Sequence, residues 1–357
     1  MKTRRKSIPR ATQPILCRHR FLLGCLASAL FAVVCQPRAF AQETSILVGS
    51  GSSVPAPLYT QWAATYNKRN PAIQMRYLPI GASEGINEMS RGNGDFGAGE
   101  VPLTAAQRSG GSLTELPILV IGIVPIYNLP GVSQGLHLSG EVLAEIYLGE
   151  IKNWSDPQLK KLNPSLSLPD LPIKVFNRPG GKGSNYVFTD FLSKSSSKFK
   201  SRIGTTASPS WPVGSAAERS ADMADKIKGE SGSIGYVELQ YAVKSSIPHA
   251  AVLNPAGNFV KASPDSIAAS CRQVEAPGWD KFSASLANAP GAESFPITGF
   301  SWLYLRTSSS DSRRAAAMSN LLEWMFTDGE LLAAQEGYSD LPQQLLAKVK
   351  AKVNSLR

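Results

Sequence analysis

The sequence predicts an α/β fold, and two features of its apolar residues carry that prediction. From Ser45 onward, short apolar segments of strand length alternate with segments whose apolar residues recur at helical spacing. The most continuously apolar part of the chain beyond its N-terminal region is residues 116–127, in which Pro117 and Pro125 exclude one long helix. This segment is therefore predicted to be a buried strand with a crossing point in it.

The alternation is clearest in the N-terminal third. One helix is predicted from apolar residues that share a face, and Asn70-Pro71 ends it; these residues are Leu58, Tyr59, Trp62, Ala63 and Tyr66. Strands are predicted before and after this helix, followed by a short helix and a strand edge, at residues 45–48, 73–78, 85–91 and 95–98.

The remainder of the chain continues the pattern. Helices are predicted at residues 141–148, 185–192 and 313–326, and strands at residues 174–176 and 233–237. The serine-rich stretch 193–201 is predicted to be an exposed, solvated turn.

A second long apolar segment, residues 295–305, lies about 170 residues after the first. Two such strands fit a chain that crosses twice between two lobes. They also fit two core strands of a single sheet. The pattern alone leaves both arrangements open.

Residues 1–41 have the features of a secretory signal peptide. Seven basic residues precede an apolar run from Phe21 to Cys35, and Ala39-Phe40-Ala41 forms a small-x-small cleavage site. The run is about 15 residues long, too short to span a bilayer as a stable helix. We therefore expect a mature, periplasmic protein that begins near Gln42.

Two other export routes have partial signals in the same segment. Arg4-Arg5 is a twin-arginine pair, but it lies far from the apolar run. Cys25 is a candidate lipoprotein cysteine, but Arg18 and Arg20 stand where a lipobox needs apolar residues. Ordinary secretion is the favoured interpretation.

Removing the signal peptide changes the charge of the chain. It holds eight of the 37 Lys and Arg residues and none of the 27 Asp and Glu residues, so 29 basic residues remain against 27 acidic ones. The high isoelectric point is thus mostly a property of the signal, and nucleic-acid binding is not expected. Only Cys271 remains of the four cysteines, so the mature chain is expected to have no internal disulfide.

Four loops rich in glycine and hydroxyl groups are the candidate site. They occupy residues 49–57, 79–85, 95–104 and 178–186; the third is acidic, and the fourth carries Arg178 and Lys182. Backbone N–H groups at the start of a helix lack partners and attract anions, and glycine allows close approach of a ligand. Together the loops predict an oxyanion receptor.

Catalysis has little support in the sequence. Beyond the signal peptide only His137 and His249 are available, neither lies in a loop with a nucleophile, and no spacing predicts a metal site. The GSGSS sequence lacks the strand-turn-helix elbow of serine hydrolases. A secreted phosphatase is thus the least favoured reading, and no cofactor is expected.

The four loops, in this order, resemble those of the periplasmic phosphate-binding proteins of ABC-type phosphate importers. The similarity extends to AEIYLGEIKNWSDPQLKKLNP, SWPVGS, GSIGYVELQYA and FPITGFSWLYL, which together span nearly the whole mature chain. The resemblance implies a type II periplasmic binding protein fold with two lobes and two crossover strands. It places residues 42–122 plus 299–357 in lobe one and residues 123–298 in lobe two.

The same resemblance implies a function. Such a protein captures inorganic phosphate between its lobes and delivers it to the permease of an ABC importer, as a monomer and without catalysis. A receptor for another oxyanion and a phosphate-binding protein that serves no importer remain alternatives.

The resemblance also implies phosphate-binding residues, beginning with the first two loops. Ser53 and the N–H of Val54 occupy family contact positions, with Ser52 beside them. Ala82 stands where the family has a serine, so one hydrogen bond is lost, and Ser83 is the candidate replacement.

In the third and fourth loops, the resemblance implies contacts from Glu100, Arg178, Gly183 and Ser184. Glu100 takes the place of an aspartate that accepts a phosphate proton; its alternative role is to cap a helix or loop. Arg178 is implied to bind phosphate, with a surface ion pair as its alternative.

Two further departures in the fourth loop concern charge. Gly180 stands where the family has the aspartate that pairs with the arginine, and Lys182 replaces a serine that contacts phosphate. The ammonium of Lys182 is expected either to face the ligand or to extend into solvent, and the sequence leaves both possibilities open.

Overall fold

The computed structural model describes residues 44–355, except 111, 274–281, 283 and 309. Within these limits residues from Thr44 onward form one compact unit. The predicted signal peptide, with its three cysteines, lies outside the described residues.

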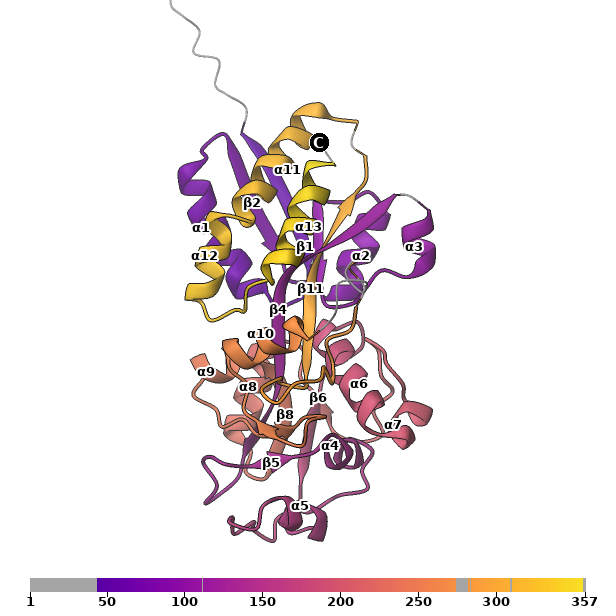
Figure 1. Cartoon of the computed structure of the whole chain (residues 1–357), viewed down its shortest axis with the longest axis vertical. Helices are drawn as coiled ribbons and strands as arrows, with labels where there is room; N and C mark the ends of the chain where they lie inside the picture. The colour runs from indigo at the N-terminus through magenta and orange to yellow at the C-terminus, as the bar shows by residue number, and fades with distance from the viewer. Residues whose placement is uncertain (1–43, 111, 274–281, 283, 309, 356–357) are drawn as a thin grey trace, which may run out of the picture. The chain divides into compact units, whose positions relative to one another are not determined.

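The N-terminal part of the main sheet is parallel. Strand β1 (Ser45–Gly51) pairs with β2 (Ile73–Leu78) on one side and β3 (Phe96–Gly99) on the other. Helices α1 (Ala56–Arg69) and α2 (Ala82–Ser90) connect these strands (Figure 1). Each strand therefore ends in a loop that leads toward a helix N-terminus, which is the arrangement expected for an anion site.

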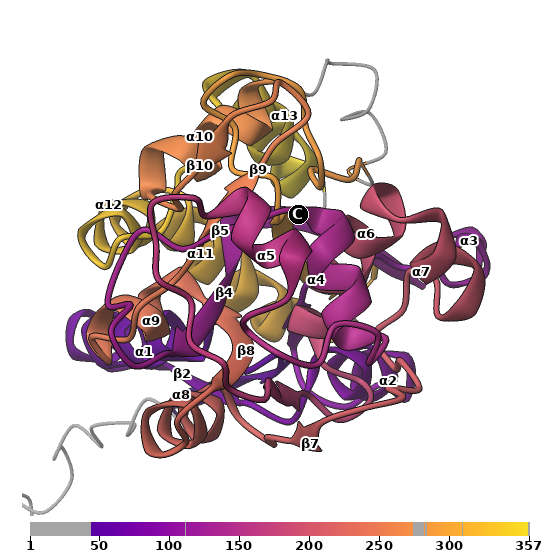
Figure 2. The ribbon, with the colours of Figure 1, turned by 90° about the horizontal axis from the view of Figure 1, so that it is seen from below.

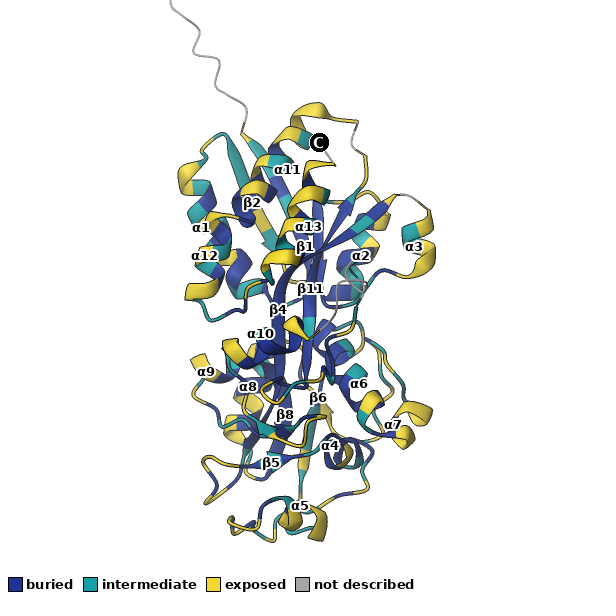
Figure 3. Ribbon diagram, in the orientation of Figure 1, coloured by how far each residue is buried: buried dark blue, intermediate teal, exposed yellow. Residues whose placement is uncertain are grey.

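Two long strands run through the middle of the sheet: β4 (Leu113–Asn128) and β11 (Thr298–Arg306). Residues 113–122 of β4 pair with β11, and residues 123–128 pair with β8 (Ser233–Glu238), both antiparallel. Both long strands are buried over most of their length (Figure 3). The predicted buried strand with a crossing point is thus confirmed, because β4 changes its partner midway.

The complete strand order is β2-β1-β3-β11-β4-β8-β6-β7, in which β6 is Lys174–Asn177 and β7 is Ser215–Ala216. Both predicted apolar segments are therefore neighbouring strands, β4 and β11, in the centre of one sheet. A separate small sheet joins β10 (Phe259–Val260), β9 (Ala251–Leu253) and β5 (His137–Leu138).

Helices cover the second half of the sheet on both sides. Figure 2 shows α8 (Ser220–Gly229) and α6 (Gly183–Ser195) on opposite sides of β8, and both contact that strand. The other helices in this half are α4 (Gly140–Tyr147), α5 (Pro157–Leu162), α7 (Ser197–Arg202), α9 (Leu239–Lys244) and α10 (Pro264–Arg272).

The C-terminal helices return to the first half. After β11 come α11 (Ser312–Met325), α12 (Asp328–Gln335) and α13 (Gln343–Asn354); α11 packs on β1 and α12 on α1. The indole of Trp62 on α1 donates to the carbonyl oxygen of Gly329 at 2.8 Å, which satisfies its polar group inside the core. The short α3 (Ala105–Ser109) precedes β4.

Most predicted elements are present, with their ends moved by a few residues. The strand at 73–78 has the predicted bounds, and the terminal helix begins and ends within one residue of its prediction. The exposed turn predicted at 193–201 is wrong. Ser193 belongs to α6, and the buried Ser196 accepts a hydrogen bond from the N–H of Phe199 at the start of α7. The serines cap and flank helices, a role that composition alone does not distinguish from a turn.

Candidate anion-binding site

Arg178 is the centre of the candidate site. It follows β6, and its side chain is almost fully buried, with 1% of its surface exposed. Nη1 donates to Ser220 Oγ at 3.0 Å, while Nη2 donates to Ser53 Oγ at 3.2 Å and to the carbonyl oxygen of Glu218 at 3.1 Å. Nε is buried and has no hydrogen-bond partner within the described part of the chain. A buried guanidinium with an unused donor is suited to bind an oxyanion.

The predicted loops come together around this arginine. The N–H of Gly81 donates to the carbonyl oxygen of Gly51 at 2.7 Å, which joins the first and second loops. The N–H of Ser83 donates to the carbonyl oxygen of Gly181 at 3.2 Å, which joins the second and fourth. The Arg178–Ser53 bond joins the fourth and first. Loops from distant parts of the sequence thus converge on one place.

Three helices point their first turns into these loops. For α1, α2 and α6, no side-chain cap is found among the described residues, whereas Ser139 caps α4 and Ser263 caps α10. An uncapped first turn keeps its N–H groups available to a ligand. Ser184 in the first turn of α6 is fully buried, and its hydroxyl has no partner in the region that the structure describes.

Glu100 lies at the end of β3, fully buried. Oε1 accepts a hydrogen bond from Ser301 Oγ on β11 at 2.9 Å, and Oε2 lacks a hydrogen-bond partner among residues with a described position. Burial raises the pKa of Glu100 to about 8, a shift that the nearby hydroxyls of Ser52 and Ser301 oppose and the charge of Glu238 reinforces. Glu100 is not the cap of any helix in the described region; the following helix, α3, is capped by Thr104.

Gly183 fits the space next to Glu100. A Cβ added to Gly183 would overlap Glu100 Oε2 and crowd its Cβ. The absence of a side chain thus lets the first turn of α6 approach the carboxylate.

Glu238 and Ser220 belong to the same cluster, although the sequence analysis did not identify them. Glu238 ends β8 and is fully buried, and its Oε1 accepts a hydrogen bond from Ser220 Oγ at 2.9 Å. One signal was available: Glu238 is an acidic residue in a strand whose other residues, SIGYV, are apolar, glycine or serine. A carboxylate in a buried strand is rare unless it has a specific partner.

Lys182 has its ammonium paired with the carboxylate of Glu218, which is largely exposed. The side chain of Lys182 is itself 14% exposed, so it lies at the edge of the cluster. The ammonium of Lys182 thus neither faces a ligand as a free charge nor extends into solvent, because it is paired with Glu218.

The other two residues of the fourth loop with predicted charge effects are Gly180 and Arg178. Gly180 is exposed. Arg178, in contrast, forms no surface ion pair in the described region.

The remaining predicted residues line the first two loops. Val54 is buried, and its N–H donates to Ser52 Oγ at 3.1 Å. Ala82 is fully buried against Gly99, and Ser83 is partly exposed with its N–H bonded to Gly181.

Comparison with known proteins assigns the family. A PBP superfamily domain matches residues 38–329. The chain belongs to the PBP superfamily. It is 33% identical over 324 residues to the phosphate-binding protein PstS of Pasteurella multocida, covering 90% of this chain and 94% of that one. It is 34% identical over 314 residues to PstS of Haemophilus influenzae, covering 88% and 93%.

Solved structures give the same fold for this PBP superfamily member. One is described as a putative phosphate ABC transporter substrate-binding protein with bound phosphate from Clostridium perfringens. It has a TM-score of 0.62 at 19% identity, over 84% of this chain and all of that one. At this identity the likeness concerns the fold alone. It agrees with the predicted two-lobed periplasmic binding protein architecture.

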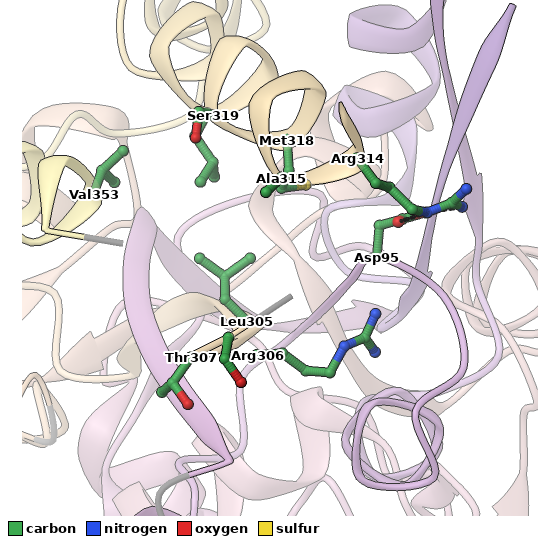
Figure 4. Close-up of a pocket in the computed structure, with 11 residues that line it drawn as sticks. Asp95, Leu305, Arg306, Thr307, Arg314, Ala315, Met318, Ser319 and Val353 are labelled. Carbon is green, nitrogen blue, oxygen red and sulfur yellow. Dashed lines mark hydrogen bonds and ion pairs between the residues drawn. The ribbon is translucent and has the colours of Figure 1, made fainter. Parts of the chain in front are cut away.

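A pocket lined by two arginines lies elsewhere in this PBP superfamily chain. It has a volume of about 90 Å³ and is lined by residues of β11, α11 and α13 (Figure 4). There Arg314 turns to Asp95, with its Nε and Nη2 at 2.5 and 2.8 Å from the two carboxylate oxygens. Asp95 therefore already satisfies the guanidinium of Arg314.

The residues described here contain no group of three or more His, Cys, Asp or Glu side chains arranged to hold a metal ion. Within the same residues, no helix is both long and apolar enough to cross a membrane.

Proposed function

We propose that this chain is a secreted substrate-binding protein that captures inorganic phosphate and delivers it to an ABC importer. The observation that carries the proposal is the convergence of a buried guanidinium, an uncapped helix N-terminus and a buried carboxylate, at Arg178, α6 and Glu100. The PstS relatives named above are phosphate-binding proteins, which supports the same ligand.

The mixture of donors and one acceptor favours phosphate over other oxyanions. Arg178 and the first-turn N–H groups of α6 supply donors to ligand oxygens. When ionised, Glu100 supplies an acceptor, which a protonated phosphate oxygen satisfies and a fully ionised sulfate does not. The ligand therefore needs both charge and a proton.

The proposed binding residues are those of the four loops. Side-chain contacts come from Ser53, Glu100, Arg178 and Ser184, and backbone contacts come from Val54, Ala82, Gly183 and Ser184. Ser52 orients the first loop through its bond to Val54. Ser83 and Lys182 border the site, and their own partners, Gly181 and Glu218, hold them there.

The two lobes are proposed to be residues 42–122 plus 299–357 and residues 123–298. The strand pairing supports this division, since β4 pairs with β11 up to Gly122 and with β8 from Ile123. The partner of β11 at Gly122 is Thr298, next to the second boundary. The binding loops of the two parts contact each other through Arg178 and Ser53.

Export to the periplasm is proposed from the predicted signal peptide, and a monomeric state from the resemblance to phosphate-binding proteins. The exported protein is expected to begin near Gln42, and its intact mass measures this directly. A mass that retains residues 1–41, or that shows acylation at Cys25, would contradict cleavage by ordinary signal peptidase.

Calorimetry of the exported protein with inorganic phosphate tests the function. We expect micromolar or tighter affinity, equivalent to about 8 kcal/mol or more. No heat of binding at millimolar phosphate would refute the proposal, and preferential binding of another oxyanion would reassign the ligand. Turnover of a chromogenic phosphate ester would indicate an enzyme instead. Transport of phosphate that depends on this chain and on an ABC permease tests the partner.

A further inference from the structure

The buried charge of Arg178 needs a counter-charge, because an unpaired guanidinium strongly destabilises a protein interior. Lys182 and Glu218 neutralise each other at the edge of the site. Of the carboxylates inside the cluster, Glu238 is the one connected to the guanidinium by hydrogen bonds, through one side chain.

That connection is directional. Arg178 Nη1 donates to Ser220 Oγ at 3.0 Å, and Ser220 Oγ donates its single hydrogen to Glu238 Oε1 at 2.9 Å. The serine hydroxyl thus accepts from the cation and donates to the anion, as its one proton and its lone pairs allow. All three side chains are at most 1% exposed. The arrangement fixes the rotamer of Ser220 and one end of the guanidinium.

We propose that Glu238, acting through Ser220, is the counter-charge that positions Arg178 and, together with Glu100, limits the site to anions that carry a proton. The role in ligand selection rests on the proposed function, because it assumes that phosphate is the ligand. The role of Glu238 in positioning Arg178 does not depend on that assumption.

The charge balance explains the selectivity. One guanidinium and two carboxyl groups share the buried cluster, so its net charge is −1 when all three are ionised and 0 when Glu100 holds its proton, as it does below its pKa of about 8. A fully ionised anion therefore meets no surplus of positive charge, whereas a protonated one can donate to a carboxylate oxygen. Oε2 of Glu100 and Oε2 of Glu238 are both buried without partners among the described residues, so each can accept such a proton when its carboxyl is ionised.

Asp222 is a charged group in the surroundings: its hydrogen bond to Arg219 lowers its pKa most, and the charge of Arg178 also lowers it. Burial raises the pKa of both Glu100 and Glu238, and the nearby Arg178 opposes the rise at Glu238. The other titratable groups that interact with the pair are tyrosines whose own pKa values are raised by burial, so they stay neutral: Tyr59, Tyr77 and Tyr304 near Glu100, Tyr241 near Glu238, and Tyr338 near both.

A ligand-free experiment tests the pairing. Thermal unfolding is compared for wild type, Arg178→Met, Glu238→Gln and the double variant. Each single change should lower Tm by at least about 5 °C, since it leaves a buried charge without its partner. The decrease in Tm of the double variant should be clearly smaller than the sum of the two single decreases. Additive losses would overturn the pairing.

A selectivity experiment tests the effect on the ligand. Calorimetry with phosphate and with sulfate gives the ratio of their affinities. Glu238→Gln should lower the phosphate preference at least about tenfold, because one negative charge is gone, and Glu238→Asp should keep it. Ser220→Ala, a smaller change that breaks the connection, should shift the ratio in the same direction as Glu238→Gln.

Glu115→Gln is the matched control. Glu115 is also a buried carboxylate with an arginine partner, Arg108, but it lies outside the cluster. Its substitution should leave the phosphate-to-sulfate ratio unchanged. An unchanged ratio in Glu238→Gln would overturn the role in selectivity. A wild type that binds no phosphate would instead refute the proposed function, while the unfolding experiment would still decide the pairing.

Discussion

Glu100 and Gly183 lie in direct contact, the first at the end of β3 and the second at the start of α6. Space for the carboxylate exists because residue 183 has no side chain, since a Cβ there would overlap Oε2. The contact brings an acceptor and a set of N–H donors to the same point. Phosphate binding is thus expected to depend on a backbone position that makes no side-chain contact itself.

Gly183→Ala should abolish measurable phosphate binding or weaken it by about 2 kcal/mol or more, because Glu100 or the first turn of α6 has to move. Calorimetry measures the affinity. Gly229→Ala, at the end of α8, is the control, since beyond its chain neighbours and the adjacent backbone of its own helix no atom of the described residues lies within 4 Å of its added Cβ. Equal affinities for the two variants would contradict the importance of the contact.

Arg178→Ala should weaken phosphate binding by roughly 2 to 5 kcal/mol, because a desolvated oxyanion loses its charge-assisted donors. Isothermal titration at fixed pH measures the loss. Arg314→Ala is the control: this arginine also pairs with a carboxylate, Asp95, but in the separate pocket of Figure 4. A similar loss in both variants would indicate a general effect on folding.

Glu100→Gln should relax the exclusion of sulfate. Unlike an ionised Glu100, the neutral amide does not repel a fully ionised anion, and its NH₂ group donates to one. Competition between sulfate and phosphate above pH 8, where the carboxyl of Glu100 is ionised, measures the change. If wild type already bound sulfate as well as phosphate, Glu100 would have no role in selection.

Glu100 should also make the ligand-free protein less stable as pH rises. Its folded-state pKa of about 8 exceeds the ordinary value of 4.5, so the folded protein holds a proton that the unfolded chain has released. This contribution is complete below about pH 4.5 and is lost as pH rises toward 8, at most by about 1.4 kcal/mol per pH unit.

Urea unfolding of wild type and Glu100→Gln between pH 5 and 8 isolates this contribution, because the other titrating groups are common to both proteins. The stability of wild type should fall relative to the variant across that range. Parallel curves would show that Glu100 is ionised in the folded protein throughout.

The sequence was sufficient for the parts of the fold and site that depend on local pattern. The strand 73–78, the long buried strand around Val120 and the loops after the strands follow from apolar spacing and from glycine and serine positions. Glu100 and Arg178 could be placed at the site by resemblance to a family with ordered motifs.

The remaining parts depend on contacts between distant residues. Glu238 balances Arg178 only because β8 and β6 are neighbours in the sheet, which no local pattern encodes. Ser301 reaches Glu100 because β11 returns beside β3. The turn predicted around Ser196 failed for a related reason: serine serves helix caps and turns alike, and the following helix decides between them.

Lys182 gives the last prediction, because its partner determines whether the site gains a positive charge. Its ammonium pairs with Glu218, so we expect phosphate affinity between pH 6 and 8 to follow the same profile in wild type and Lys182→Ser. Lysine stays protonated across this range, and an ammonium facing the ligand would favour the phosphate dianion and steepen the wild-type profile. Glu218→Gln should be measured alongside, since it removes the carboxylate that neutralises Lys182. In this variant the affinity for phosphate should rise more steeply with pH than in wild type. A steeper profile in wild type than in Lys182→Ser would show that the ammonium acts on the ligand despite Glu218.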